Sequence, residues 1–133
     1  MAVAFNQGGG LLASGSEDAT VKVFAMSTWA LVATLTQHTS SVRSVAFGGG
    51  LLASGSFDKT VKVFATSTWA PLATLTVHTE SINSVAFNPD AGLLASGSDD
   101  TTIKVFATST WDVVATLTQH TGGVQGVAFN QGG

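Results

Sequence analysis

Residues 42–79 read VRSVAFGGGLLASGSFDKTVKVFATSTWAPLATLTVHT, and this stretch decides the fold. Its apolar residues alternate with a period of two over short runs, and turn residues separate the runs, a pattern typical of β-strands. Four strands are expected, over residues 42–47, 51–56, 60–64 and 72–76. Because no run shows the longer apolar period of a helix, the stretch predicts one antiparallel four-stranded sheet.

The same pattern occurs three times along the chain. The tripeptide Val-Ala-Phe begins at residues 3, 45, 85 and 127, at intervals of 42, 40 and 42 residues. Self-similarity at this period indicates a repeat architecture, whose sheets bury their apolar faces by stacking on one another. The 133 residues therefore form a single propeller segment of three units, over residues 3–44, 45–84 and 85–126. Residues 127–133 follow these units and repeat residues 3–9 letter for letter.

Separated landmark residues keep their register from unit to unit. His38, Ser54 and Asp58 have counterparts at the same places in the next unit, which are His78, Ser96 and Asp100. In this respect the units resemble the Trp-Asp (WD) repeats of β-propellers, in which His, Ser, Asp and Trp form a hydrogen-bonded set that joins the strand connections. The resemblance implies an all-β fold, a β-propeller made of four-stranded antiparallel blades with three blades in this chain.

The units depart from the family pattern at three landmark positions, one of which is the Gly before the histidine, replaced here by Gln37, Val77 or Gln119. Phe replaces the Trp of the set and Ala replaces the Asp that usually follows it, so the eponymous dipeptide is missing at residues 24–25, 64–65 and 106–107. Phe has no indole N–H to donate to the serine. We expect a weaker polar set within an unchanged strand pattern.

Composition excludes several classes of function. The chain is 44% hydrophobic and 10% charged, with a net charge of −3 and no cysteine, so disulfides and thiol chemistry are excluded. Its five cations are scattered singly, which excludes a basic stripe for nucleic acid. No apolar run reaches the roughly 20 residues needed to cross a bilayer, so no membrane partner is expected. The first residues do not match a secretory signal, which leaves the cytoplasm as the default location.

The histidine register predicts contacts between copies of the chain. In the family, each histidine serves the serine and aspartate that follow it, so His120 has no such partners in its own chain. Ser14 and Asp18, in turn, have no preceding histidine. We expect His120 of one chain to complete the set of Ser14 and Asp18 in a neighbour.

Three blades are fewer than the four to eight of common propellers, so we expect the ring to close by homo-oligomerisation. A trimer with nine blades is favoured over a dimer with six, because a spare inner strand would crowd the smaller ring. Val127 and Phe129 are expected to form an inner strand of the neighbour's first blade, where Val3 and Phe5 compete for the same place. The repeat with its identical overlap indicates either a natural fragment or an engineered piece of a propeller.

The recurring Ser, His and Asp also invite comparison with serine hydrolases. Such enzymes need an exposed nucleophile beside a base, together with oxyanion donors. Because the set recurs at every junction between units, we interpret it as structural and expect no catalytic residue. The three histidines fall in different units and the acidic pairs lack calcium-loop spacing, so no metal and no cofactor is expected.

Repeated aromatic residues offer the main alternative function. Trp29, Trp69 and Trp111 each lie in the turn between the third and fourth strands, where the family usually has Gly. They either seal the core between blades or form a circle of exposed aromatic side chains that binds sugars or peptides. On the opposite face, four positions are candidates for a peptide-binding rim: Arg43, Phe57, Asn83 and Gln125. The sequence thus predicts a non-enzymatic, self-assembling interaction scaffold, with a lectin-like ring as the alternative.

Overall fold

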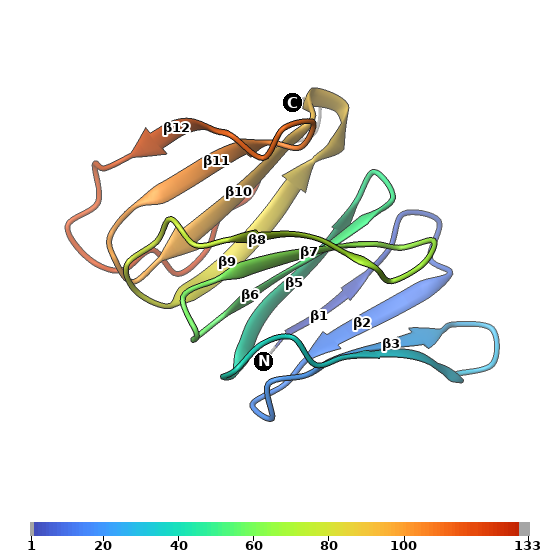
Figure 1. Ribbon diagram of the computed structural model, residues 1–133. Coiled ribbons are helices and arrows are strands. Elements are labelled where there is room, and N and C mark those ends of the chain that lie inside the picture. The colour runs from blue at the N-terminus through green and yellow to red at the C-terminus, as the bar shows by residue number, and fades with distance from the viewer. Residues whose placement is uncertain (1, 131–133) are drawn as a thin grey trace.

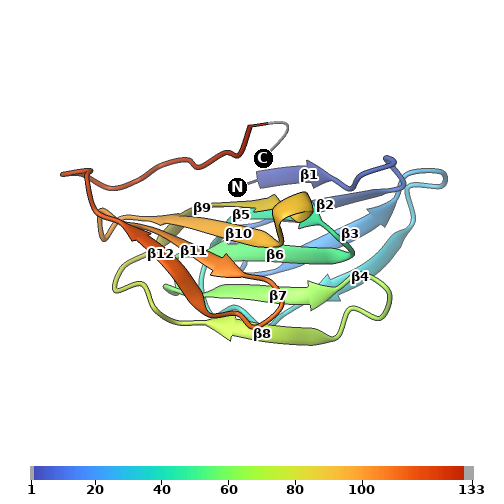
Figure 2. The ribbon, with the colours of Figure 1, turned by 90° about the horizontal axis from the view of Figure 1, so that it is seen from above.

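The computed structural model describes residues 2–130, which form three antiparallel four-stranded sheets arranged as successive blades (Figure 1). This confirms the predicted fold class. Each blade follows the chain order, with its first strand on the inner edge and its last on the outer edge (Figure 2). The strands of blade 1 are β1 (Ala2–Phe5), β2 (Leu11–Gly15), β3 (Val21–Ala25) and β4 (Leu31–Leu35). Those of blade 2 are β5 (Val42–Gly48), β6 (Leu51–Ser56), β7 (Val61–Ala65) and β8 (Pro71–Leu75), and those of blade 3 are β9 (Ile82–Asn88), β10 (Leu93–Ser98), β11 (Ile103–Ala107) and β12 (Val113–Leu117).

Turn chemistry sets the strand ends, which differ by about one residue from those expected in blade 2. Thr60 is part of the turn rather than the first residue of β7, because its N–H donates to Asp58 Oδ1 over 2.9 Å. In blade 3 the first turn is longer and contains a 3₁₀ helix, η1 (Pro89–Ala91), which ends at Gly92 in the left-handed conformation. Among the described residues, no helix is long and apolar enough to cross a membrane.

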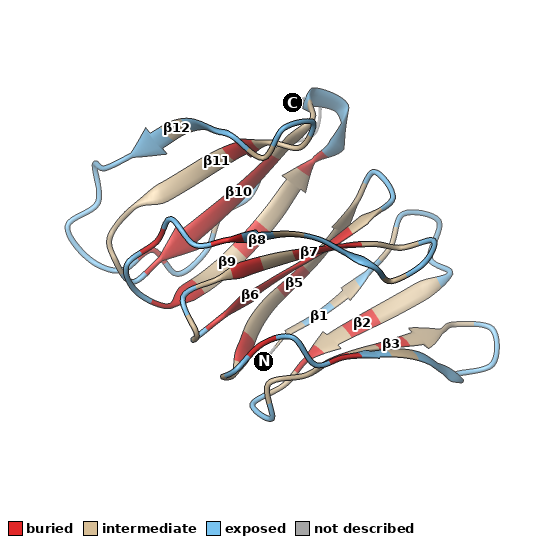
Figure 3. Cartoon of the chain, viewed as in Figure 1, coloured by how far each residue is buried: buried red, intermediate tan, exposed pale blue. Residues whose placement is uncertain are grey.

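The core lies between the blades. At the first junction, Val21, Val23 and Leu35 of blade 1 pack with Leu52 and Phe64 of blade 2. The equivalent residues pack at the second junction, with Val61, Val63 and Leu75 of blade 2 against Leu94 and Phe106 of blade 3. Accordingly, β6 and β10 are largely buried, whereas the outer strand β12 is largely exposed (Figure 3).

Glycine in the second strand of each blade permits close approach of the next inner strand. A Cβ atom added at Gly15 would lie 2.7 Å from Cγ1 of Val42, and one added at Gly55 would lie 2.6 Å from Cγ2 of Ile82. No real Cβ tolerates such a distance, so each glycine forms a seat for the branched residue.

The third seat, at Gly97, is occupied by the C-terminal tail. Beyond β12 the described chain forms no further strand, and residues 124–129, here called the tail, run along the inner edge of the arc (Figure 2). A Cβ at Gly97 would lie 2.7 Å from Cγ1 of Val124, which is only 4% exposed. The tail therefore lies beside blade 3 in the position of a following inner strand, without being part of any sheet.

Candidate functional site

A buried histidine links each blade-to-blade connection to the following blade. Nδ1 of His38 lies 2.8 Å from Asp58 Oδ2, and its Nε2 lies 2.7 Å from Ser54 Oγ. Since a carboxylate only accepts, the Nδ1–H donates to Asp58, and the neutral ring accepts the Ser54 hydroxyl at Nε2. His78 makes the same contacts at the same distances, with Asp100 and Ser96.

The hydrogen bonds of the set keep its aspartates ionised. Burial by itself raises the pKa of Asp58, but hydrogen bonds from Thr60, His38 and the Thr39 backbone outweigh burial and lower the pKa to about 2. The pKa of Asp100 is also lowered, by the corresponding hydrogen bonds against the effect of burial. Burial lowers the pKa of His38 and of His78 below 6.5, against the opposing effect of the aspartates. The sets therefore pair a neutral imidazole with an ionised carboxylate.

The burial of these sets indicates a structural rather than a catalytic role. Ser54 and Ser96 are 0% exposed, and His38 is 6% exposed, so a substrate carbonyl cannot reach either hydroxyl. At the Trp position, Phe64 lies fully buried in the core of the first junction. Apolar packing takes the place of an indole hydrogen bond there, and the set serves as a clasp between connection and blade.

The remaining members of the predicted sets are not brought together within one chain. His120 is exposed, Ser14 is half-buried and Asp18 is exposed. Asp18 instead accepts hydrogen bonds from the side chain and backbone of Thr20, which lower its pKa. Blade 1 thus has the serine and aspartate of a set, and the segment beyond blade 3 has the histidine.

The tryptophans lie in left-handed turns between the third and fourth strands. Their φ angles are 58° for Trp29, 62° for Trp69 and 63° for Trp111, a backbone region that favours glycine. Trp69 packs against the core of the first junction and Trp111 against that of the second, so each side chain covers the junction with the preceding blade. Trp29, which has no preceding blade, is 64% exposed. This arrangement favours core packing as the role of the tryptophans.

The candidate rim residues form a chain of contacts across blades. The Arg43 guanidinium lies 5.1 Å from the centre of the Phe57 ring, and its Nη1 donates to Asn83 Oδ1 over 3.1 Å. Asn83 in turn donates to Asp99 Oδ1 over 2.7 Å and to the Val124 carbonyl over 3.0 Å. Gln125 is exposed beside them. The sequence placed the turn at Asp99 on this same face, but its contact with Asn83 depends on how the segments meet in space.

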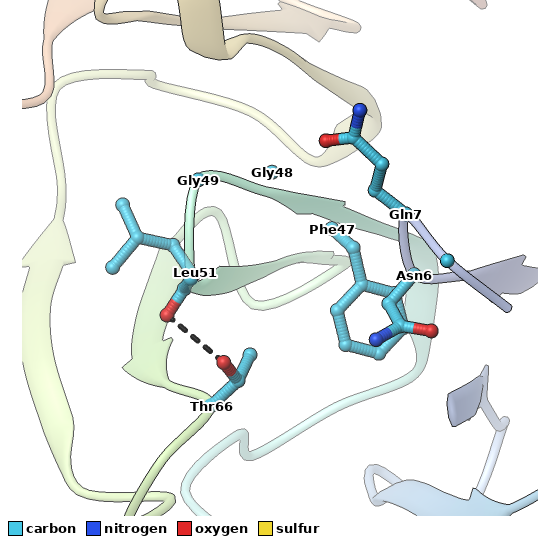
Figure 4. Close-up of a pocket in the computed structure, with 9 residues that line it drawn as sticks. Asn6, Gln7, Phe47, Gly48, Gly49, Leu51 and Thr66 are labelled. Atoms are coloured by element: carbon cyan, nitrogen blue, oxygen red, sulfur yellow. Dashed lines mark hydrogen bonds between the residues drawn. The ribbon is translucent and has the colours of Figure 1, made fainter. Parts of the chain in front are cut away.

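A pocket of about 360 Å³ opens between the first turns of blades 1 and 2 (Figure 4). Its walls are Phe47, Leu51, Thr66 and the polar ends of Asn6 and Gln7, together with several glycines. No ionisable side chain lines it, so it offers no acid–base chemistry. Within residues 2–130, no cluster of three or more His, Cys, Asp or Glu side chains could hold a metal ion.

Blades that stack around an inner edge, with a His–Ser–Asp clasp at each of the two internal junctions, define this chain as part of a β-propeller. The profile of the WD40 family (WD domain, G-beta repeat) matches residues 1–24, 29–64 and 69–107, which is most of the sequence. The chain therefore belongs to the WD40 repeat family, and the predicted resemblance is confirmed. Proteins of this family are generally non-enzymatic scaffolds that bind other proteins or peptides.

Solved propeller structures share this fold at low sequence identity. The crystal structure of the RRP9 WD40 repeats superposes with a TM-score of 0.89 over 94% of this chain, at 22% identity. The structure of U3-55K gives the same values, and a chain of the mitotic checkpoint complex gives a TM-score of 0.90 over 96% of this chain, also at 22% identity. The chain spans 39–41% of the length of these structures. No curated protein sequence matches it.

Proposed function

We propose that this chain is a non-enzymatic propeller segment that closes into a ring with copies of itself and serves as a protein-interaction scaffold. One observation carries the proposal: equivalent residues are buried at the two internal junctions and exposed at the two ends of the arc. Each end thus presents half of a junction that the same chain completes elsewhere.

The open face of blade 3 forms the first half of the proposed contact between two copies, which we call the seam. Leu117 is 43% exposed, whereas its counterparts Leu35 and Leu75 are 6% and 9% exposed under the next blade. Ile103 and Val105 are half-buried, although their counterparts in blades 1 and 2 are fully buried. Together with Ala95 and the tail, these residues line a pocket of about 290 Å³.

The open face of blade 1 supplies the complementary half. Phe24 is only half-buried, whereas its counterparts Phe64 and Phe106 are 0% and 1% exposed. Phe64 packs on Val21, Val23 and Leu35, which are the counterparts of the residues that line the pocket on blade 3. Phe24 of a second copy therefore has the shape and chemistry to fill that pocket, with Leu12 and Trp29 beside it. Complete burial of such a side chain contributes roughly 1.5–3 kcal/mol.

The number of copies in the proposed ring is two or three. Our expectation remains a trimer with nine blades, because the duplicated strand would crowd a dimer with six blades. A head-to-tail contact of this kind must close or continue to grow. The superposition of the arc on propeller chains supports closure, since it shows that the blades turn as they do in that fold.

The scaffold role rests on the family and on the rim, because WD40 proteins bind other proteins or peptides. Phe57 is 48% exposed beside Arg43 and offers an apolar anchor for a peptide. For the tryptophans, the packing of Trp69 and Trp111 against the cores of the two junctions supports a role in the core rather than the lectin-like alternative.

Leu117→Asp tests the proposed self-association. Its matched control is Val114→Asp on the same strand, because Val114 is 56% exposed and its counterparts at the internal junctions, Val32 and Leu72, are exposed as well. In sedimentation velocity, we expect Leu117→Asp to reduce the particle to one chain, while Val114→Asp keeps the wild-type mass. Self-association through this face is contradicted if Leu117→Asp leaves a multi-chain mass unchanged.

A further inference from the structure

We infer that the tail of one copy replaces β1 of the next copy at each seam, and that His120 thereby completes the set with the neighbour's Ser14 and Asp18. The inference rests on the proposed self-association. It decides which of the two identical segments, residues 3–9 or residues 127–133, supplies the inner strand of blade 1; of the second segment, residues 131–133 lie outside the described part of the chain.

The first observation is that the tail already has the backbone position of an inner strand. The Val42 N–H, where β5 begins, donates to the Ser16 carbonyl of blade 1 over 2.9 Å. The Val124 N–H donates to the Ser98 carbonyl of blade 3 over 2.8 Å. Both valines also occupy a glycine seat, so the tail begins against blade 3 as β5 begins against blade 1.

A second pair of contacts extends the match to the Val-Ala-Phe segment itself. The Val85 N–H of β9 donates to Ser44 Oγ of β5 over 3.0 Å. The Val127 N–H donates to Ser84 Oγ of β9 over 3.1 Å. Val127 therefore lies beside β9 in the same way that Val85 of β9 lies beside β5. This is the position that the first strand of a following blade would take.

If a second copy supplies that blade, its own β1 and the tail compete for one position. β1 pairs with β2 through Val3 opposite Ser14, Ala4 opposite Ala13 and Phe5 opposite Leu12. Because the tail carries the same tripeptide at Val127–Phe129, it can make the same pairs with the neighbour's β2. The exchange of one strand for an identical one leaves the pairing within blade 1 unchanged.

The contacts that hold the tail on blade 3 then decide whether the tail or the neighbour's β1 occupies this position. If the neighbour's β1 stays in place, the tail must leave the Gly97 seat, which exposes Val124 and breaks its hydrogen bonds to Ser98 and Asn83. β1 is held less firmly, since Val3 is 69% and Phe5 59% exposed. Displacement of β1 is therefore the less costly arrangement.

The exchange also places His120 where the incomplete set needs it. His38 precedes Val42 by four residues, His78 precedes Ile82 by four, and His120 precedes Val124 by four. At the internal junctions this spacing puts the ring 2.7 Å from the serine and 2.8 Å from the aspartate of the blade that follows. A tail paired with the neighbour's β2 carries His120 to the equivalent position beside Ser14 and Asp18.

Cysteine pairs test the inference in a chain that has no cysteine of its own. Directly opposed residues of antiparallel strands have Cα atoms about 4.5–5.5 Å apart, within reach of a disulfide. One variant combines Ala13→Cys with Ala128→Cys, and its matched control combines Ala13→Cys with Ala4→Cys. After mild oxidation of the assembled protein, we expect the first variant to run as cross-linked multiples on a non-reducing gel and the control to remain uncross-linked.

The outcomes separate the inference from the proposed self-association. A control that closes a disulfide within one chain, while the Ala13–Ala128 variant stays uncross-linked in a multi-chain particle, overturns the exchange and leaves self-association standing. A wild-type protein that sediments as one chain overturns both. Loss of the multi-chain mass in His120→Ala, with the fold retained by circular dichroism, is the expected companion result.

Discussion

At the residue scale, the clasp of His38 is stable because its buried polar groups all have hydrogen-bond partners. The imidazole is almost fully buried, yet both of its nitrogens have partners, one an ionised carboxylate and the other a buried hydroxyl. Buried polar groups cost little when they are satisfied and much when a partner is removed. The clasp therefore stabilises the connection between blades even though the family's indole donor is missing.

Removal of the imidazole should destabilise blade 2. His38→Ala removes the buried hydrogen bonds of the ring to Ser54 and Asp58, which leaves the Ser54 hydroxyl only a long contact of 3.5 Å with the Lys62 carbonyl. We therefore expect a loss of about 1–3 kcal/mol in the free energy of unfolding. Thr39→Ala is the matched control, since its exposed side chain is removed while its N–H still donates to Asp58. Urea denaturation measures both variants, and equal losses would show that the clasp contributes nothing.

The pKa shifts predict lower stability in acid. The histidines of both clasps have a pKa below 6.5 in the folded protein, so the unfolded chain binds protons first and stability falls as the pH drops below about 6.5. The aspartates add a second loss below pH 3.8, which for Asp58 continues to its folded pKa of about 2. Urea midpoints measured between pH 8 and pH 3 should therefore fall steadily. A midpoint that is flat or rises between pH 7 and pH 5 would contradict the neutral, buried state of His38 and His78.

At the scale of elements, the strand bounds could be predicted closely from the alternation of apolar and polar residues and from the turn residues between the runs. In blade 2 the expected strand bounds lie within one residue of β5, β6, β7 and β8. Glycines end β5, and Ser56 and Asp58 end β6, where the turn geometry requires them. The clasp residues were also predictable, since the order of His, Ser and Asp recurs in each unit and the resemblance to WD repeats implies their hydrogen bonds. By contrast, the contacts of Arg43 with Asn83 and of Asn83 with Asp99 join different blades, so no local pattern in the sequence indicates them.

The glycine seat makes the position of the tail testable. In Gly97→Ala the new Cβ would lie 2.7 Å from Cγ1 of Val124, so we expect the tail to leave blade 3. Amide exchange at Val124 and Val127 should then accelerate at least tenfold, which corresponds to a loss of about 1.4 kcal/mol. Gly126→Ala is the matched control, because a Cβ there meets no atom within 4 Å. Equal protection of the tail in both variants would show that the seat does not hold it.

At the scale of the whole molecule, the proposed ring requires that the two ends of the arc match each other. Blade 3 presents a pocket at the place that Phe64 and Phe106 fill elsewhere, and blade 1 presents Phe24 without a pocket. The repeat in the sequence predicted that such ends would exist. The sequence left open which of the two Val-Ala-Phe segments belongs at the seam, because identical residues carry identical information, and the difference lies in the burial of Val124 and the exposure of Val3.

The solution mass of the wild-type chain tests the self-closing ring most directly. Light scattering after gel filtration should give a single species at two or three times the chain mass of 13.5 kDa, with three times as our expectation. Because the proposed contact between copies would bury apolar side chains, this mass should persist at high salt, which screens charges. A mass of one chain at every concentration measured would contradict the account.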